Sequence, residues 1–213
     1  YNLTNEGGYG NKIHFLKNIT GLWIIQEARH HYQSQGASYS FDEIVKLALT
    51  APAHSAFIDP NAIDFLSPGD IPQRIIDFCH RTGQIIPDSH AQVFRIIYES
   101  LALKCRESIE QIAQCTGKKY DTIHIIGGGT KAAILCQMIA DATDKTVIAG
   151  PVEASALGNI AIQLMTSGAI ANLKEARKII KQSAEPITYC PNNNTAWQHA
   201  YQQYLSILQE EAL

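Results

Sequence analysis

Thr-Ile-His-Ile-Ile-Gly-Gly-Gly, residues 122–129, is the stretch that decides the fold. Its five mostly β-branched residues followed by three glycines predict a buried strand that ends in a tight turn. Apolar residues then recur at helical spacing from Thr130 to Ala142, so we expect a helix after the turn. Because glycine has no side chain, a flat or anionic ligand can approach the backbone amides and the helix N-terminus behind them. The alternative is a plain connection between a strand and a helix, without a ligand.

The glycines fail one nucleotide-binding pattern and match another. A Walker phosphate loop ends in Gly-Lys-Ser/Thr, whereas this chain reads Gly-Thr-Lys-Ala at 129–132, which excludes that loop. Gly127, Gly129 and Ala132 satisfy the dinucleotide pattern G-x-G-x-x-A, which normally opens the first unit of its domain. Here more than half of the chain precedes the pattern, and the next expected strand, 146–149, ends without an acidic residue. A nicotinamide-binding oxidoreductase domain is therefore a poor fit, but it stays open as an alternative.

The composition is that of an ordinary globular domain. The chain has 213 residues, of which 46% are hydrophobic and 17% are charged, with a net charge of -3. This composition lacks the strong positive charge that nucleic-acid or membrane binding favours, so we expect a protein that acts on small molecules. No apolar run approaches the length of a bilayer span, and the first residues lack the basic and apolar regions of a signal peptide. We therefore expect a cytoplasmic location.

Cysteine and histidine residues give no sign of a metal site. The five cysteines are scattered, odd in number and without C-x-x-C spacing, so we expect buried free thiols rather than a disulfide or metal framework. His30 and His31 adjoin each other, and we assign them no role. We expect no metal ligands in this chain.

The N-terminal third of the chain predicts a loop, a strand and a helix. Tyr1–Gly10 is polar and rich in glycine, which indicates a flexible loop. Alternation over 13–19 predicts a short strand, and Thr20 is placed to cap a helix over 21–33. Further helices are expected over 41–50, 71–81, 89 to about 115, 153–161, 173–182 and 195–211, and a further strand over 186–189.

Two separated segments of the sequence carry further motifs. The first reads Thr-Asn-Glu-Gly-Gly at 4–8 and Leu-Lys-Asn-Ile-x-Gly-Leu-Trp-x-x-Gln at 16–26. The second reads His-Ile-Ile-Gly-Gly-Gly-Thr-Lys at 124–131 and Val-Ile-Ala-Gly-Pro-Val-Glu-Ala-Ser-Ala-Leu-Gly-Asn-Ile at 147–160. Together the two segments resemble one family of proteins, the FGGY carbohydrate kinases, and within it most closely the rhamnulokinases. The second segment is similar to the family's adenosine-binding segment.

This resemblance implies a fold and an activity. The family has the actin/hexokinase-type fold, in which two RNase H-like domains close on ATP and a sugar. Residues 1–213 would be the C-terminal, nucleotide-binding domain of such a two-domain sugar kinase, an α/β domain with a mixed sheet flanked by helices. The implied reaction phosphorylates a ketose, L-rhamnulose, to L-rhamnulose 1-phosphate. Its partners would be the sugar, ATP with Mg²⁺, and the N-terminal domain that this fragment lacks.

The resemblance also assigns residues. Asn18 would contact the sugar, and an amide suits that role because it both donates and accepts hydrogen bonds. On spacing alone, Asn18 is a turn residue and Gln26 a solvated helix side chain. The family match would give Gln26 a nucleotide contact, together with the glycine turn and the two residues that follow it: Gly127, Gly128, Gly129, Thr130 and Lys131. The catalytic base belongs to the N-terminal domain in the family, so we expect no catalytic residue here and no activity from the fragment alone.

The chain departs from the family inside this motif. The usual pattern after the third glycine is Ser/Cys-Gln/Lys-Asn, with a second asparagine four positions further on. Here Ala132 and Cys136 stand at the two asparagine positions. The loss of two amides leaves a third interpretation open, that of a non-catalytic domain that kept the fold and lost its nucleotide site.

Overall fold

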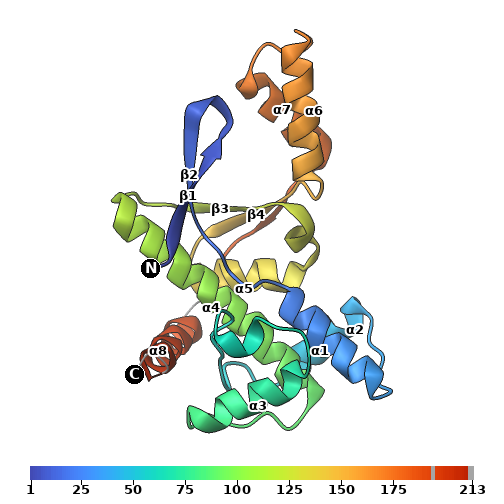
Figure 1. Ribbon diagram of the computed structural model, residues 1–213, viewed down its shortest axis with the longest axis vertical. Helices are drawn as coiled ribbons and strands as arrows, with labels where there is room; N and C mark the ends of the chain where they lie inside the picture. Colours follow the sequence, from blue (N-terminus) through green and yellow to red (C-terminus); the bar gives the residue numbers. More distant parts are fainter. Residues whose placement is uncertain (193–194, 211–213) are drawn as a thin grey trace. The chain divides into compact units, whose positions relative to one another are not determined.

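A computed structural model of the chain describes residues 1–192 and 195–210, and it divides the chain into two compact units (Figure 1). The first unit comprises Tyr1–Lys119 together with the C-terminal helix α8, Thr195–Glu210. The second unit is formed by the intervening residues, which begin at Tyr120. The glycine turn belongs to the second unit, whereas Asn18 and Gln26 belong to the first.

The first unit opens with a β-hairpin. Strand β1, Leu3–Gly8, pairs antiparallel with β2, Lys12–Lys17, in a register that runs from Leu3 opposite Lys17 to Gly8 opposite Lys12. The strand expected near 13–19 is therefore confirmed, but the loop expected for Tyr1–Gly10 is wrong. The two strands satisfy each other's backbone groups, so β1 forms without a hydrophobic face of its own.

Five helices of the described residues follow in the first unit: α1 (Trp23–Ser34), α2 (Phe41–Thr50), α3 (Ile71–Arg81), α4 (His90–Thr116) and α8. The bounds of α2 and α3 are those predicted, because each helix begins at an explicit cap. Ser40 and Glu43 form a reciprocal capping box at α2, and the Asp70 carboxylate accepts from the Gln73 N–H at α3. The last predicted residue of α8, Glu211, lies outside the described residues.

Helix α4 forms the centre of the first unit's core. It contacts α1, α2, α8 and strand β2, and its middle turns are buried on most sides. Phe94, Ile97 and Leu103 are all at most 2% exposed. Within the described residues, neither α4 nor any other helix combines the length and apolar character that a bilayer crossing requires.

The second unit contains a three-stranded sheet of mixed direction. Strand β4 (Thr146–Ala149) pairs parallel with β3 (Thr122–Ile125) and antiparallel with β5 (Ile187–Tyr189). Helix α5 (Ala133–Thr143) contacts β4 and β5, and α6 (Ala154–Thr166) packs on α7 (Leu173–Ala184). The predicted fold class, α/β with a mixed sheet flanked by helices, is confirmed.

Two expectations about the deciding stretch are corrected. Strand β3 is half-exposed rather than buried, because it lies at the edge of the sheet and is paired on one side within the described strands. The helix begins at Ala133 rather than at Thr130, because the glycines first form a tighter 3-10 helix over Gly127–Lys131.

The five cysteines are free thiols, as predicted, but only some are buried. Cys79 and Cys136 are fully buried, Cys105 is half-buried, and Cys115 and Cys190 are exposed. The expectation of burial is therefore wrong for the two exposed thiols, which lie at the end of α4 and just after β5.

Candidate functional site

The glycine turn is held in place by backbone hydrogen bonds within the second unit. The Gly127 N–H donates to the Pro151 carbonyl at 3.0 Å, and the Gly150 N–H donates to the Ile125 carbonyl at 2.8 Å. Gly127 has a φ of +76°, a conformation that side chains disfavour. The ends of the parallel strands β3 and β4 are thus tied together where the turn begins.

The turn leaves its middle residue open. A methyl group added at Gly128 would meet no atom within 4 Å, whereas one added at Gly129 would lie 3.6 Å from Ile125 Cγ2. Gly128 is exposed, and its φ is not in the left-handed region. The expectation that nothing projects from this face of the turn is therefore met within the second unit.

The two residues after the glycines differ in what their side chains do. Thr130 is 9% exposed, and its hydroxyl donates to the Gly127 carbonyl at 2.7 Å, so this side chain closes the turn on itself. The Lys131 side chain is exposed. Of the two, Lys131 has the side chain that is free to reach an anionic ligand, and Thr130 would act through the shape of the turn.

Cys136 and Ala132, the two residues that depart from the family pattern, both lie next to the glycine turn. Cys136 is fully buried, with its Sγ 3.7 Å from the Gly129 carbonyl oxygen, and burial raises its pKa. Its side chain therefore packs against the turn from the interior of the second unit. Ala132 is the N-cap of α5, and no side chain caps that helix. The first turn of α5 thus lacks the hydrogen bond that a polar N-cap supplies.

Asn18 and Gln26 are both exposed in the first unit. Gln26 lies in the first turns of α1, and Ile24 beside it is fully buried while Trp23 is half-buried. The sequence predicted Thr20 as the cap of this helix, and that prediction is wrong. The helix begins at Trp23, so its N-cap is Leu22, which makes no side-chain hydrogen bond. The Thr20 N–H donates to Asn61 Oδ1 at 2.8 Å.

Asn61 holds the segment that carries Asn18. Its Nδ2 donates to the Asn18 carbonyl at 3.0 Å while its Oδ1 accepts from Thr20. The Asn61 N–H in turn donates to Asp59 Oδ1 at 3.0 Å. One amide side chain therefore fixes two backbone groups of a segment that has no regular secondary structure.

A buried lysine supports this arrangement. Lys104 of α4 is 4% exposed, and its Nζ lies 3.0 Å from Asp59 Oδ1 and 2.8 Å from Glu107 Oε2. A lysine is rarely buried unless it is paired, so these two carboxylates compensate its charge. The network runs from the core helix through Asp59 and Asn61 to the Asn18 backbone.

Sequence reasoning missed Asp59, Asn61 and Lys104. The signal for Lys104 was a single charged residue following the apolar run Leu-Ala-Leu at 101–103 of a core helix. The signal for the other two was Asp-Pro-Asn at 59–61, a sequence typical of turns that bind their own backbone. Neither signal names a partner, since the contacts join residues more than forty positions apart.

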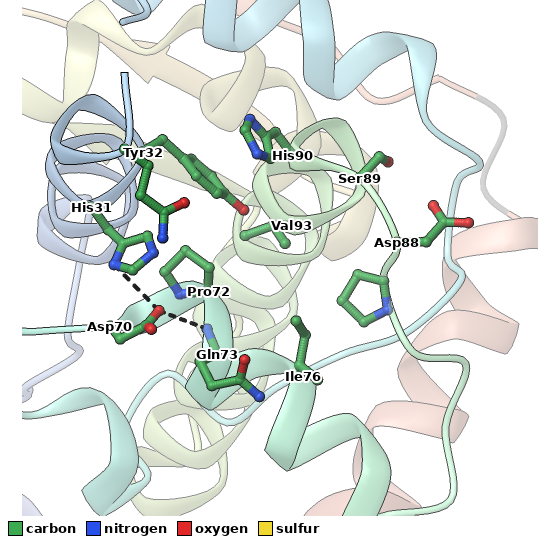
Figure 2. A pocket seen from close by; sticks show the side chains of 12 residues that line it. His31, Tyr32, Asp70, Pro72, Gln73, Ile76, Asp88, Ser89, His90 and Val93 are labelled. Carbon is green, nitrogen blue, oxygen red and sulfur yellow. Dashed lines mark hydrogen bonds and ion pairs between the residues drawn. The ribbon is translucent and has the colours of Figure 1, made fainter. Parts of the chain in front are cut away.

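A separate cavity of about 400 Å³ lies within the first unit (Figure 2). Its walls come from the end of α1, the start of α3 and the segment that leads into α4. None of the residues predicted from the sequence lines it. Among residues 1–192 and 195–210, no group of three or more His, Cys, Asp or Glu side chains is placed to hold a metal ion.

Comparison with solved structures places the fold among sugar kinases. The structure aligns with the ligand-bound xylulose kinase of Lactobacillus acidophilus at a TM-score of 0.72 and 16% identity, covering 99% of this chain and 42% of that one. It aligns with the gluconate kinase of the same organism at a TM-score of 0.64 and 16% identity, covering 98% of this chain and 42% of that one. At this identity the likeness concerns the fold.

Sequence comparison gives nearer relatives. The chain is 41% identical over 193 residues to the rhamnulokinase of Enterococcus faecalis, which covers 90% of this chain and 38% of the relative. It is 36% identical over 200 residues to that of Bacteroides thetaiotaomicron, which covers 94% of this chain and 40% of the relative. The chain thus spans about two fifths of the length of the curated relatives it matches. Residues 1–167 match the model of the FGGY carbohydrate kinase C-terminal domain, and with that match over most of its length the chain belongs to the FGGY family of carbohydrate kinases.

Proposed function

We propose that this chain is the nucleotide-binding part of an ATP-dependent kinase that phosphorylates L-rhamnulose to L-rhamnulose 1-phosphate. The observation that carries the proposal is 41% identity to a rhamnulokinase over 90% of the chain, combined with a glycine turn whose middle residue has open space beside it. The membership of the family argues against the nicotinamide-binding alternative. So does the sheet, in which one of the two strand pairs is antiparallel, unlike the parallel sheet of dinucleotide-binding domains.

In this proposal the turn holds the nucleotide through backbone groups. Gly128 and Gly129 offer backbone amides to the nucleotide, whereas Gly127, whose N–H is bonded to the Pro151 carbonyl, contributes through the shape of the turn. Lys131 offers a cation for a phosphate oxygen. Gln26 contributes a further amide to the nucleotide, and Asn18 contacts the hydroxyls of the sugar. Mg²⁺ enters bound to the phosphates, since phosphoryl transfer requires neutralisation of their charge.

Phosphoryl transfer also needs a base for the accepting hydroxyl and a second set of phosphate contacts. We assign neither to a residue of this chain. The 213 residues alone are therefore expected to bind nucleotide without turnover. Adding the N-terminal domain of a full-length relative should give kinase activity. Steady turnover by the 213 residues alone would contradict the assignment.

Thermal unfolding in the presence of ligands tests the nucleotide site directly. A ligand that binds the native state stabilises it by about 2.7 kcal/mol at 100 times its Kd. ATP with Mg²⁺ should raise the unfolding temperature, whereas NAD should not. Stabilisation by neither nucleotide would favour the non-catalytic interpretation.

A matched pair of variants separates the site from the fold. Gly128→Ala places a methyl group on the open face of the turn, where it touches no protein atom within 4 Å. It should keep the unfolding temperature of the free protein and abolish the shift caused by ATP and Mg²⁺. Ser183→Ala, at an exposed position of α7 outside both segments that resemble the family, is the control and should keep that shift.

A further inference from the structure

The cavity in the first unit is partly open to solvent and is lined by side chains from three separate segments (Figure 2). Its volume of about 400 Å³ is in the range of small-molecule sites, which is about 300–1,000 Å³. Pro72, Ile76, Pro87 and Val93 provide apolar walls. The remaining lining residues are polar, so the cavity combines an apolar lining with hydrogen-bonding groups at its edge.

Tyr32 directs its hydroxyl into this cavity. The residue is 5% exposed, its ring stacks on His90 at a centroid distance of 3.6 Å, and its edge meets Phe94. Figure 2 shows the hydroxyl in the middle of the lining side chains. Within the described residues the hydroxyl makes no hydrogen bond to another protein group, so it is open to a partner that enters the cavity.

Two of the polar residues that line the cavity are carboxylates, Asp70 and Asp88. Asp70 uses Oδ1 for the Gln73 N–H at 3.0 Å and for His31 Nδ1 at 3.4 Å, and its second oxygen has no partner among the described residues. The Asp88 carboxylate likewise makes no hydrogen bond or ion pair in the part of the chain that the structure describes. Figure 2 shows these two carboxylates on opposite sides of the cavity.

The same lining argues against an anion. No lysine or arginine is among the twelve lining residues. The N-termini of α3 and α4 reach the cavity, but Asp70 and Ser89 already cap them by accepting from the Gln73 and Gln92 N–H groups. Burial, together with the nearby His31, lowers the pKa of His90, which disfavours the cationic form of this ring; its Nδ1 lies 2.9 Å from the Tyr39 hydroxyl.

We propose that this cavity binds a small organic dication, an α,ω-diamine whose two ammonium groups pair with Asp70 and Asp88. The methylene chain between them lies against the proline, isoleucine and valine walls. The Tyr32 hydroxyl oxygen accepts a hydrogen bond from one of the ammonium groups. This site is independent of the proposed nucleotide and sugar residues, none of which lines the cavity.

Titration calorimetry of the chain with 1,4-diaminobutane tests the proposal. We expect saturable binding of one molecule, weaker binding of butylamine by about tenfold or more because one ion pair is lost, and no binding of butane-1,4-diol. Tyr32→Phe should weaken the diamine about fivefold, the effect of one hydrogen bond. Asp88→Asn should weaken it about tenfold, and so should Asp70→Asn, which retains a good N-cap for α3.

Asp42→Asn is the matched control, because it removes one exposed carboxylate of α2 that does not line the cavity. It should leave the diamine affinity unchanged. The proposal is overturned if the diamine gives no saturable heat, or if the Asp70 and Asp88 variants bind as the Asp42 variant does. Either result is distinguishable from failure of the proposed kinase function, which the shift in unfolding temperature with ATP and Mg²⁺ measures separately on the same protein.

Discussion

Asn61 Nδ2 donates a hydrogen bond to the backbone carbonyl of Asn18 at 3.0 Å, across forty-three positions of the chain. The same side chain accepts from the Thr20 N–H at 2.8 Å. The segment between β2 and α1 has no cap and no ladder of its own, so its conformation depends on this one amide. Asn18, the residue proposed to contact the sugar, is thereby placed by a residue that need not touch the sugar.

Asn61→Ala should destabilise the first unit and disturb Asn18. Two hydrogen bonds, each contributing about 0.5–1.5 kcal/mol, are lost, so urea unfolding should show a decrease of about 1–3 kcal/mol. In a full-length kinase that contains this domain, the KM for sugar should rise several-fold with the KM for ATP nearly unchanged.

Asn61→Asp provides a second test of the same contact. An aspartate keeps an acceptor for the Thr20 N–H but turns a carboxylate oxygen toward the Asn18 carbonyl, where the amide donated. Its sugar KM should rise as in the alanine variant. Equal increases in the KM for sugar and for ATP would show a general loss of structure instead of a displaced Asn18.

Gly150→Ala should be the most damaging glycine substitution in the second unit. Gly150 has a φ of +133°, a region almost confined to glycine, and an added Cβ would lie 3.3 Å from Pro186 Cα and 3.4 Å from Pro186 Cβ. We expect a loss of about 2 kcal/mol or more in the free energy of unfolding, measured with urea. Gly128→Ala, where no such contact exists, should change it by less than about 0.5 kcal/mol.

The sequence predicted those parts of the fold that depend on local signals. Helices α2 and α3 begin at side-chain caps that are written in the sequence, and their bounds agree with the structure. The hairpin strand β1 could not be predicted in this way, because four of its six residues are exposed and no alternation marks a buried face. Its formation depends on pairing with β2, which sequence periodicity does not report.

The candidate site likewise contains features that the sequence predicted and features that it did not. The glycine turn and its open face follow from the absence of side chains, which is a local property. Asn61 and Lys104 act through contacts with distant residues, so composition and spacing did not identify them. The cavity at Tyr32 was also missed, because His31 and His90 meet Asp70 and Tyr32 only after α1, α3 and α4 have packed.

The free thiols should react in an order set by their burial. Cys115 and Cys190 are exposed and should react with Ellman's reagent in the native protein. Cys79 should stay protected until the first unit unfolds, because it is fully buried and burial raises its pKa to about 11. Replacing Cys115 and Cys190 by serine should remove the fast phase, and a fast phase that persists in the double variant would contradict the structure.

The stability of the first unit should fall as the pH decreases below about 6.5. Burial lowers the pKa of His54 from its ordinary value of 6.5. The nearby Arg95 lowers this pKa further, whereas Glu99 raises it. A base whose folded-state pKa is lowered binds its proton more readily when unfolded, so the contribution is intact above the unfolded pKa and is lost as pH falls through the folded pKa. His90 acts in the same direction, since burial lowers its pKa too.

His54→Asn tests the contribution of that one ring. His54 has a φ of +56°, and asparagine tolerates this conformation while it does not titrate. The variant loses the edge-to-face contact with Trp197, whose ring centroid lies 4.6 Å from that of His54. It should therefore be somewhat less stable than the native sequence at pH 8. Between pH 8 and pH 5 its unfolding free energy should decrease less than that of the native sequence. An unchanged pH dependence would exclude His54 as a source of the effect.

Ala132→Asn should have two separable consequences at the glycine turn. Ala132 is the N-cap of α5, which has no side-chain cap, so an asparagine there should stabilise the second unit by about 1 kcal/mol in the absence of ligand. The substitution also restores an amide that the FGGY pattern has at this position. If that amide contacts the nucleotide, calorimetry should show ATP binding several-fold tighter than in the native sequence. Ala132→Ser caps the helix without an amide, so tighter ATP binding by both variants would assign the gain to the helix, and tighter binding by the asparagine variant alone would assign it to the nucleotide.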